Sequence, residues 1–287
     1  MARLEYTFKT DTLFKMLFVQ HPDLLKHLVA TLLAIPQESI GQFVITNPDI
    51  PPDTKGEKFC RLDINMAVNG QRVTLEVQVE NEGDYPIRSL YYWARSYSTA
   101  LSEGSKYKDL PRTVIISILD FDLFSASDFH SEFCPLEVKR HELLSDKMSL
   151  HFFELKKLPA CELETSNKLL LWLSLFKANT EEELARIKAL KEPIMEQAIN
   201  AYERITVTTE FQEKERQLSR ARHNEASAIY NAEQRGEQRG EQRGREEERV
   251  VWQGVVADKD SKLADKDAEL ERLRAELTAI KAKEGSP

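Results

Sequence analysis

The stretch RLDINMAVNGQRVTLEVQVE, residues 61–80, contains the dipeptide that decides the local fold. The Asn-Gly pair at 69–70 is typical of a two-residue type I′ hairpin turn, because both central positions of that turn need a positive φ. This turn fixes the pairing of the two strands, and counting outward from it places Asp63 directly opposite Glu76. The sequence therefore predicts an antiparallel hairpin in which two carboxylates face each other.

The alternation of side chains along the second strand of this hairpin bears on what the two acids do. Its apolar side chains point to one face, and its polar side chains, Glu76 among them, point to the other. A solvated polar face is the ordinary interpretation of such alternation. Like charges directly across an antiparallel pair are destabilising, however, so a divalent cation bound between Asp63 and Glu76 is the alternative interpretation. Mg²⁺ typically uses one or two carboxylates together with water and phosphate oxygens.

Composition limits the classes of protein to which the chain can belong. Its formal net charge is −8 over 287 residues, so binding to nucleic acid requires a local basic patch rather than a global field. Three cysteines without C-x-x-C spacing argue against a disulfide framework or a structural zinc site, and favour a reducing compartment. No apolar run approaches the roughly 18 residues of a membrane span, and no secretion signal is present. We therefore expect a cytoplasmic protein that does not enter a membrane.

Apolar patterns and turn signals predict the elements of an α/β domain over residues 1–205. In addition to the hairpin, we expect helices near 11–20, 22–34, 86–103, 166–177, 181–190 and 192–203, and strands near 42–46, 112–121, 133–139 and 149–155. The strand at 112–121 is almost continuously apolar, which is typical of a central strand covered on both faces. This order of elements predicts a mixed sheet flanked by helices.

The composition changes near residue 205, after which the chain is highly charged and rich in helix-forming residues. Residues 206–249 form a low-complexity segment that contains EQRG repeats at 233–244. We interpret the segment as a partly disordered helical linker, because each glycine costs a helix roughly 1 kcal/mol relative to alanine. A helix-packing face made by the regularly spaced glycines is the alternative.

Residues 250–287 are predicted to form a short coiled-coil tail. Apolar residues occupy the a and d positions of one heptad register from Trp252 to Ile280, and Lys259 and Lys266 interrupt that pattern. A helix of this kind gains most of its stability when another helix covers its apolar face. We therefore expect the tail to make the protein a homo-oligomer.

Three stretches have an order and spacing that match a known family. DTLFKMLF at 11–18 precedes the hairpin, LEVQ at 75–78 lies within it, and RSLYYWARSYSTALSEGSKYKDLPRTVIISIL at 88–119 follows it. Together they resemble the Rpn family (recombination-promoting nucleases, YhgA-like) of the PD-(D/E)XK nuclease superfamily, over residues 8–205. The resemblance implies a restriction-endonuclease-like α/β core, Mg²⁺ as the cofactor, DNA as the substrate and a role in recombination or mobile elements.

The resemblance also assigns roles to four residues of the predicted site. Asp63 and Glu76 match the metal-binding carboxylates, and Asp11 matches an amino-terminal acid that completes such sites. Gln78 occupies the position of the superfamily lysine. Its amide carries no positive charge but can orient a water molecule by hydrogen bonding.

Basic residues near the predicted site are candidate contacts to the DNA backbone. Lys15 lies one helical turn after Asp11, and Arg88 and Arg95 lie on the helix at 86–103 among aromatic residues. Asp11, Lys15 and the aromatic residues of this helix each have an ordinary alternative interpretation. Asp11 is then a helix N-cap, Lys15 is a solvent-exposed residue, and the aromatic residues of the helix belong to the core.

We predict a Mg²⁺-dependent endonuclease that hydrolyses phosphodiester bonds of DNA. The alternative is a non-enzymatic DNA- or protein-binding module on the same fold, which assembles through its coiled-coil tail. A glycosidase would also use two carboxylates, about 5–9.5 Å apart, but the neighbouring Gln78 and the lack of an aromatic sugar-binding signature disfavour it. The sequence has no Walker loop, G-x-S-x-G or G-x-G-x-x-G motif, so NTPase, serine hydrolase and dinucleotide-binding functions lack support.

Overall fold

The structure, a computed structural model, divides the chain into two compact units, residues 1–216 and residues 217–287. It describes residues 2–46, 49–50, 60–61, 63–101 and 106–284. The first unit contains the sheet and its covering helices, and the second is helical.

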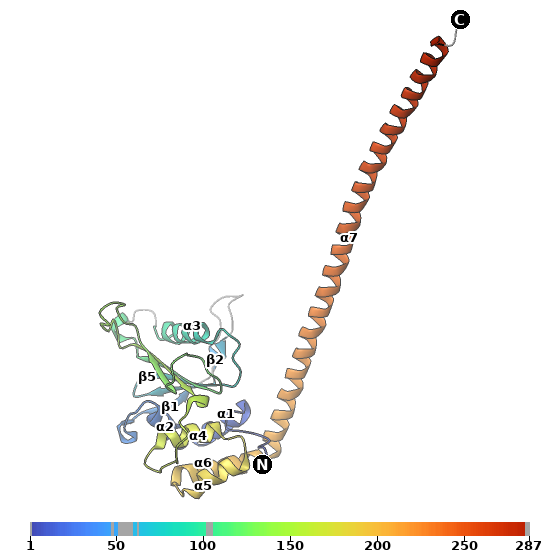
Figure 1. The fold of residues 1–287 in the computed structure, drawn as a ribbon. Helices are drawn as coiled ribbons and strands as arrows, with labels where there is room; N and C mark the ends of the chain where they lie inside the picture. Colours follow the sequence, from blue (N-terminus) through green and yellow to red (C-terminus); the bar gives the residue numbers. More distant parts are fainter. Residues whose placement is uncertain (1, 47–48, 51–59, 62, 102–105, 285–287) are drawn as a thin grey trace. The chain divides into compact units, whose positions relative to one another are not determined.

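The first unit is built on a six-stranded mixed sheet (Figure 1). In spatial order its strands are β1 (Phe43–Thr46), β4 (Ile64–Val68), β5 (Gln71–Gln78), β6 (Thr113–Leu119), β8 (Met148–Glu154) and β7 (His130–Phe133). β5, β6 and β8 run parallel, whereas β1, β4 and β7 are antiparallel to their neighbours. A separate ribbon pairs β2 (Asp49–Ile50) with β3 (Cys60–Arg61). β6 is buried along its whole length, as expected for a central strand.

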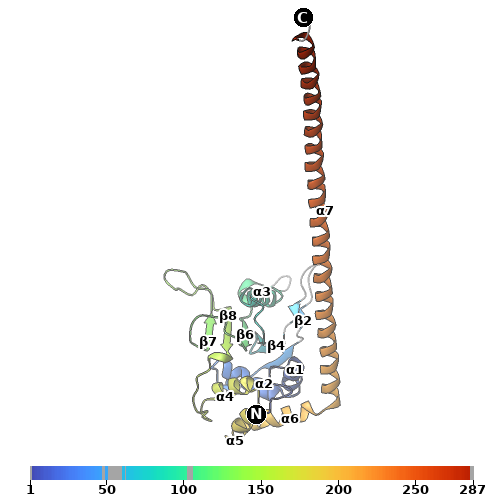
Figure 2. The same cartoon turned by 45° about the vertical axis from the view of Figure 1, so that its right-hand side comes forward.

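Helices cover both faces of this sheet, as Figures 1 and 2 show. The apolar face of the hairpin belongs to the larger core, to which several helices contribute, among them α1 (Asp11–Gln20), α2 (Pro22–Leu32), α4 (Lys168–Lys177), α5 (Glu181–Ala189) and α6 (Pro193–Thr206). On the opposite face, α3 (Tyr85–Ser98) contributes Tyr85 and Trp93 to a smaller core around Ile115 and Phe152. Short 3₁₀ turns lie at Gln37–Ser39, Tyr107–Asp109 and Leu155–Lys157. The predicted mixed sheet flanked by helices is confirmed.

The hairpin turn has the predicted geometry. Asn69 and Gly70 have φ angles of 49° and 77°, both in the left-handed region that a type I′ turn requires. β4 and β5 pair in the predicted register along the whole of β4. The Asn69 side chain also accepts hydrogen bonds from the amides of Gly41 and Gln42 and donates one to the carbonyl of Ser39. Asn69 therefore fixes the turn and ties it to the segment before β1.

The polar face of the hairpin is buried at Thr74 and Glu76, so the interpretation of that face as solvated is wrong there. Thr74 and Glu76 are each only 2% exposed. The Thr74 hydroxyl donates to Oδ1 of Asn65 on the neighbouring strand, over a distance of 2.6 Å. The physical reason for the burial is α3, which covers this face with its own aromatic residues.

The strand expected at 133–139 is also wrong, because β7 ends where that segment begins. Pro135 has no backbone N–H to donate to a ladder, so it interrupts pairing soon after Phe133. Beyond it, Leu136 and Leu143 form an isolated bridge within a loop. Both of these leucines are exposed.

A single helix, α7 (Thr209–Glu284), follows the sheet domain. It continues through the EQRG repeats, where the described chain leaves open space beside the α-carbons of the glycines at 236, 240 and 244. The residues of the repeats are helical. α7 is long but highly charged, and no described helix is apolar enough over a sufficient length to cross a membrane.

The first turns of α7 belong to the sheet domain rather than to the tail. Phe211 is fully buried, and its ring meets that of Tyr6 edge-on with the ring centroids 4.8 Å apart. The first compact unit accordingly ends at Arg216, later than the boundary predicted near residue 205. A fragment that ends at 205 lacks part of the core.

Replacing Phe211 with alanine should therefore destabilise the sheet domain by about 3–5 kcal/mol, because it leaves a cavity in a packed core. Tyr230, on the same helix, is 62% exposed, so Tyr230→Ala is the matched control and should leave stability unchanged. Urea unfolding followed by tryptophan fluorescence measures both, since Trp172 is fully buried in the domain. Equal effects of the two substitutions would show that α7 does not contribute to the domain core.

Candidate active site

A reciprocal pair of hydrogen bonds holds the two predicted carboxylates together. The amide of Asp63 donates to Oε1 of Glu76 over 3.1 Å, and the amide of Val77 donates to Oδ2 of Asp63 over 2.8 Å. Asp63 lies immediately before β4, where the regular ladder with β5 has ended. Each carboxylate thus accepts a hydrogen bond from a backbone amide of the opposite chain segment. These two bonds lie where the next backbone–backbone hydrogen bonds of the sheet would otherwise form. The structure brings both acids to one place.

Burial makes the two negative charges costly. Glu76 is 2% exposed, and this burial, together with the nearby charge of Asp63, raises the pKa of Glu76 well above its usual range. Burial also raises the pKa of Asp63, although the amide of Val77 and the ammonium of Lys15 act in the opposite direction. The pair therefore resists full ionisation when no cation lies between its members.

The first helix brings a third acid and a cation beside this pair. Lys15 Nζ lies 2.6 Å from Oδ1 of Asp11, one helical turn away, and 3.4 Å from Oδ1 of Asp63. The N-cap position of α1 is occupied by Thr10, so the interpretation of Asp11 as an N-cap is wrong. The interpretation of Lys15 as a solvent residue is also wrong, because its side chain is only 24% exposed. Asp11 and Lys15 both border the carboxylate pair.

A buried ion pair helps to place the start of α1 next to the sheet. Lys9 Nζ lies 2.9 Å from Oδ2 of Asp120, directly after β6, and donates to Oδ1 of Asn179 over 3.0 Å. The amide of Asp120 in turn donates to the carbonyl of Gln78. Lys9 is 6% exposed, so this link is part of the core. Sequence reasoning missed it, because its members are distant in the chain.

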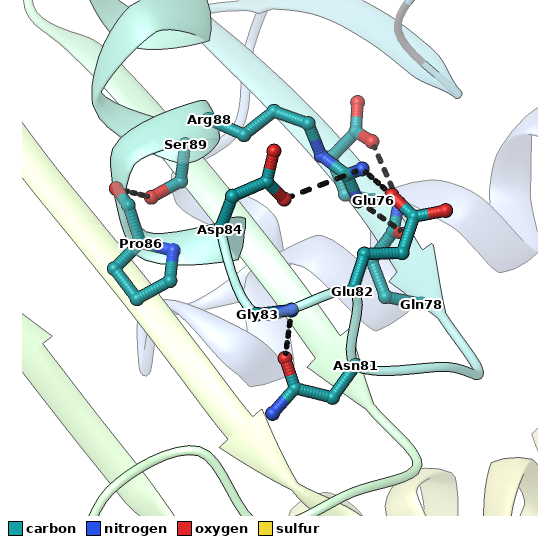
Figure 3. A network of polar contacts seen from close by, with 9 residues as sticks. All are labelled: Glu76, Gln78, Asn81, Glu82, Gly83, Asp84, Pro86, Arg88 and Ser89. Carbon is teal, nitrogen blue, oxygen red and sulfur yellow. Dashed lines mark hydrogen bonds and ion pairs between the residues drawn. The ribbon is translucent and has the colours of Figure 1, made fainter. Parts of the chain in front are cut away.

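The amino-terminal half of α3 places Arg88 beside Gln78, near Glu76 (Figure 3). Arg88 Nη2 donates to Oε1 of Gln78 over 2.8 Å, and its Nη1 pairs with Oε2 of Glu82 over 2.5 Å. The guanidinium also lies over the ring of Tyr85, 5.0 Å from its centroid. Gln78 Nε2 approaches Oε2 of Glu76 at 3.5 Å, the outer limit of a hydrogen bond. Gln78 thus connects Arg88 to the buried carboxylate.

Tyr85, which sequence reasoning did not assign to the site, lies next to Glu76. Its hydroxyl donates to Oγ of Ser117 over 2.9 Å, and Ser117 of β6 is the register partner of Glu76. Burial, and then the charge of Glu76, raises the pKa of Tyr85 well above its usual range. The only local signal was an aromatic residue at the start of a helix, and the parallel register of β5 and β6 that creates the contact cannot be read from it.

Arg95 lies at the other end of α3 and away from the acids. Arg72, near the beginning of β5, donates from Nη1 to the carbonyl of Ser96, next to Arg95 in the chain, over 2.5 Å. The carboxyl end of α3 therefore covers the start of β5, whereas Glu76 lies near the end of that strand. Of the three basic residues predicted to contact DNA, the structure brings Lys15 and Arg88 to the acids and not Arg95.

The side chains present fit a divalent cation that is completed by water or substrate. In the described part of the chain, no three His, Cys, Asp or Glu side chains are grouped so that they could enclose a metal ion. Mg²⁺ does not need such an enclosure, since one or two carboxylates with water and phosphate oxygens suffice. Asp63 and Glu76 supply two adjacent carboxylates whose mutual repulsion a cation would relieve. The arrangement is thus suited to binding a cation together with a phosphate group.

Comparison with known proteins identifies the family of the chain. The sequence model of a family described as PD-(D/E)XK nuclease family transposase matches residues 8–232, which include the sheet, its covering helices and the start of α7. Comparison with curated proteins and with solved structures gave no significant match. The family match covers more than half of the chain and confirms the resemblance to the Rpn-type nucleases. The chain therefore belongs to the PD-(D/E)XK nuclease family of transposases.

Proposed function

We propose that this protein is a metal-dependent endonuclease that hydrolyses phosphodiester bonds of DNA during recombination or the movement of mobile elements. The observation that carries the proposal is the buried pair of Asp63 and Glu76, flanked by the ammonium of Lys15 and the guanidinium of Arg88. A neutral pair at this position would stabilise the sheet better than two buried carboxylates, so stability alone does not account for the pair. Family membership supports a nuclease, whereas the choice of DNA and of Mg²⁺ is part of the proposal.

Asp63 and Glu76 are the residues that would hold the cation. When bound, Mg²⁺ would polarise the phosphodiester and lower the pKa of a bound water molecule. The protein's own contribution is orientation, because the backbone amides of Val77 and Asp63 fix one oxygen of each carboxylate. Neither side chain has to reorganise when substrate arrives, which is the condition under which such groups are most effective.

Lys15 supplies the positive charge that Gln78 lacks. Asp11 and Asp63 hold its ammonium at the border of the carboxylate pair. A lysine ammonium is a compact charge that binds phosphate oxygens well. We therefore assign to Lys15 the stabilisation of negative charge on the scissile phosphate, and to Gln78 the orientation of the attacking water through its amide.

Arg88 is assigned to the DNA backbone. Its Nη2 is engaged by Gln78, but Nη1 pairs with Glu82, whose side chain is 66% exposed. An exposed ion pair of this kind contributes little to stability, so a DNA phosphate can replace Glu82 as the partner of Nη1. A phosphate bound there would lie next to the residue that orients water.

The carboxylate assignment is tested by two isosteric substitutions, Asp63→Asn and Glu76→Gln. Both keep the oxygen that accepts the backbone hydrogen bond, and both remove the negative charge that would bind a cation. Plasmid nicking in Mg²⁺ should fall by ~10²-fold or more, a loss typical of a group that stabilises a transition state electrostatically. Glu80→Gln is the control, because Glu80 is exposed on the same chain segment.

The control and the wild-type protein should nick at equal, Mg²⁺-dependent rates. Nicking by Glu76→Gln at the wild-type rate would refute the assignment. Failure of the folded wild-type protein to nick DNA with any divalent cation would instead favour the alternative, a non-enzymatic binding module on this fold.

Lys15→Met should also reduce nicking by ~10²-fold, since it removes the positive charge next to the carboxylates and keeps a side chain of similar length. Lys15→Arg should retain more activity than Lys15→Met, because it keeps the charge. Lys139→Met removes a charge from an exposed loop and serves as the control. If Lys15→Met and Lys139→Met both nick at the wild-type rate, Lys15 is only a surface partner of Asp11.

A further inference from the structure

The carboxyl-terminal half of α7 has an apolar seam that no described residue of its own unit covers. Six apolar side chains recur at intervals of three, four or seven residues along one side of the helix, and each is about half exposed: Trp252, Val256, Leu263, Leu270, Leu273 and Leu277. A single helix in water gains little stability without packing such a face. The seam is therefore a surface for a partner helix.

Charges beside the seam identify the partner. In the heptad register of these residues, Val256, Leu263, Leu270 and Leu277 occupy a positions, and Trp252 and Leu273 occupy d positions. In a parallel two-stranded coiled coil, each g residue faces the e residue five positions further along the other helix, and these pairs set partner choice and orientation. The g residue Lys262 then faces Asp267, and the g residue Glu269 faces Arg274. Both pairs are attractive when the partner helix has the same sequence.

Other arrangements of two identical helices bring like charges together. A slip of one heptad places Glu269 opposite Asp267 along one side of the pair and Lys262 opposite Arg274 along the other. In an antiparallel pair, g positions face g positions. The antiparallel register that packs Leu270 against Leu273 then also places Glu269 next to Glu276. The parallel, unslipped arrangement avoids each of these repulsions.

We propose that residues 252–277 of α7 pair with the same segment of a second copy of this chain as a parallel, in-register, two-stranded coiled coil. Lys259 and Lys266 occupy d positions, where this arrangement brings each lysine next to its counterpart on the second copy and weakens the seam. Each is followed by an aspartate at the e position, which partly offsets the charge. The dimer is therefore specific in register and moderate in affinity. Because the helices run in the same direction, both sheet domains are attached at the same end of the coiled coil.

Sedimentation equilibrium of the full chain tests the proposal through a reciprocal charge exchange. Arg274→Glu replaces the attraction to Glu269 with a repulsion at two symmetric places, so it should weaken the dimer roughly tenfold. Glu269→Arg combined with Arg274→Glu restores an attractive pair in the parallel, unslipped arrangement and should return the dissociation constant to that of the wild type. Lys266→Leu should tighten the dimer, because it completes the apolar seam.

Arg272→Glu is the matched control, since position 272 is a c position on the outer side of the helix and should leave the dissociation constant unchanged. A wild-type chain that stays monomeric at all concentrations, or a double variant no tighter than Arg274→Glu alone, would overturn the proposal. So would an effect of Arg272→Glu equal to that of Arg274→Glu. The measurement does not depend on nuclease activity, so it stands or falls separately from the proposed function.

Discussion

The burial of Glu76 beside Asp63 is the constraint around which the site is arranged. An ionised carboxylate in the interior is expensive, and a second one next to it adds to the cost. The surrounding structure provides backbone amides for both carboxylates and a lysine from α1, yet the pKa of each acid stays raised. These groups fix the pair without neutralising it. A divalent cation bound between the two carboxylates would offset this cost, which connects the local energetics to the chemistry proposed here.

Three separate parts of the chain build this environment. The hairpin sets the register, α3 excludes water from the polar face, and α1 contributes Asp11 and Lys15. The buried contact of Lys9 with Asp120 holds the start of α1 against the end of β6. The positive charge beside the acids therefore comes from Lys15 on α1. In the superfamily motif it comes from a lysine on the strand, at the position that Gln78 occupies here. In the proposed function, the ammonium of Lys15 would supply to the phosphate the positive charge that Gln78 does not carry.

Local chemistry made the hairpin predictable. Asn69 and Gly70 admit positive φ, the alternation of apolar residues fixes the faces, and together they placed Asp63 beside Glu76 before any tertiary contact was known. The helices and the central strand followed from periodicity in the same way. The covering of the polar face by α3 was not predictable, since a strand with one polar face has the same pattern whether water or a helix lies against it. The contact of Tyr85 with Ser117 depends on parallel strand register, for which the sequence holds no local signal.

Two further boundaries could not be predicted from local sequence, the carboxyl end of the sheet domain and the end of β7. Phe211 lies in a segment whose composition is that of the charged tail, and only its packing against Tyr6 assigns it to the core. The strand expected at 133–139 failed because one proline outweighed a favourable composition. In both cases a single residue decided the boundary through a contact or a missing donor, and neither is visible in an average over a window of sequence.

The most direct test of the buried carboxylate pair is the stability of the metal-free protein as a function of pH. The pKa of Glu76 is raised in the folded state, so the folded protein holds a proton that the unfolded chain releases more easily. Stability in EDTA should therefore fall as the pH rises from the ordinary carboxyl range through that raised pKa. Urea unfolding should show this fall in the wild type and in Glu80→Gln, and Mg²⁺ should reverse it at the higher pH. In Glu76→Gln the pH dependence should be smaller and the effect of Mg²⁺ lost. If Glu76→Gln and the wild type have the same pH dependence and gain equally from Mg²⁺, the buried pair is not the cation site.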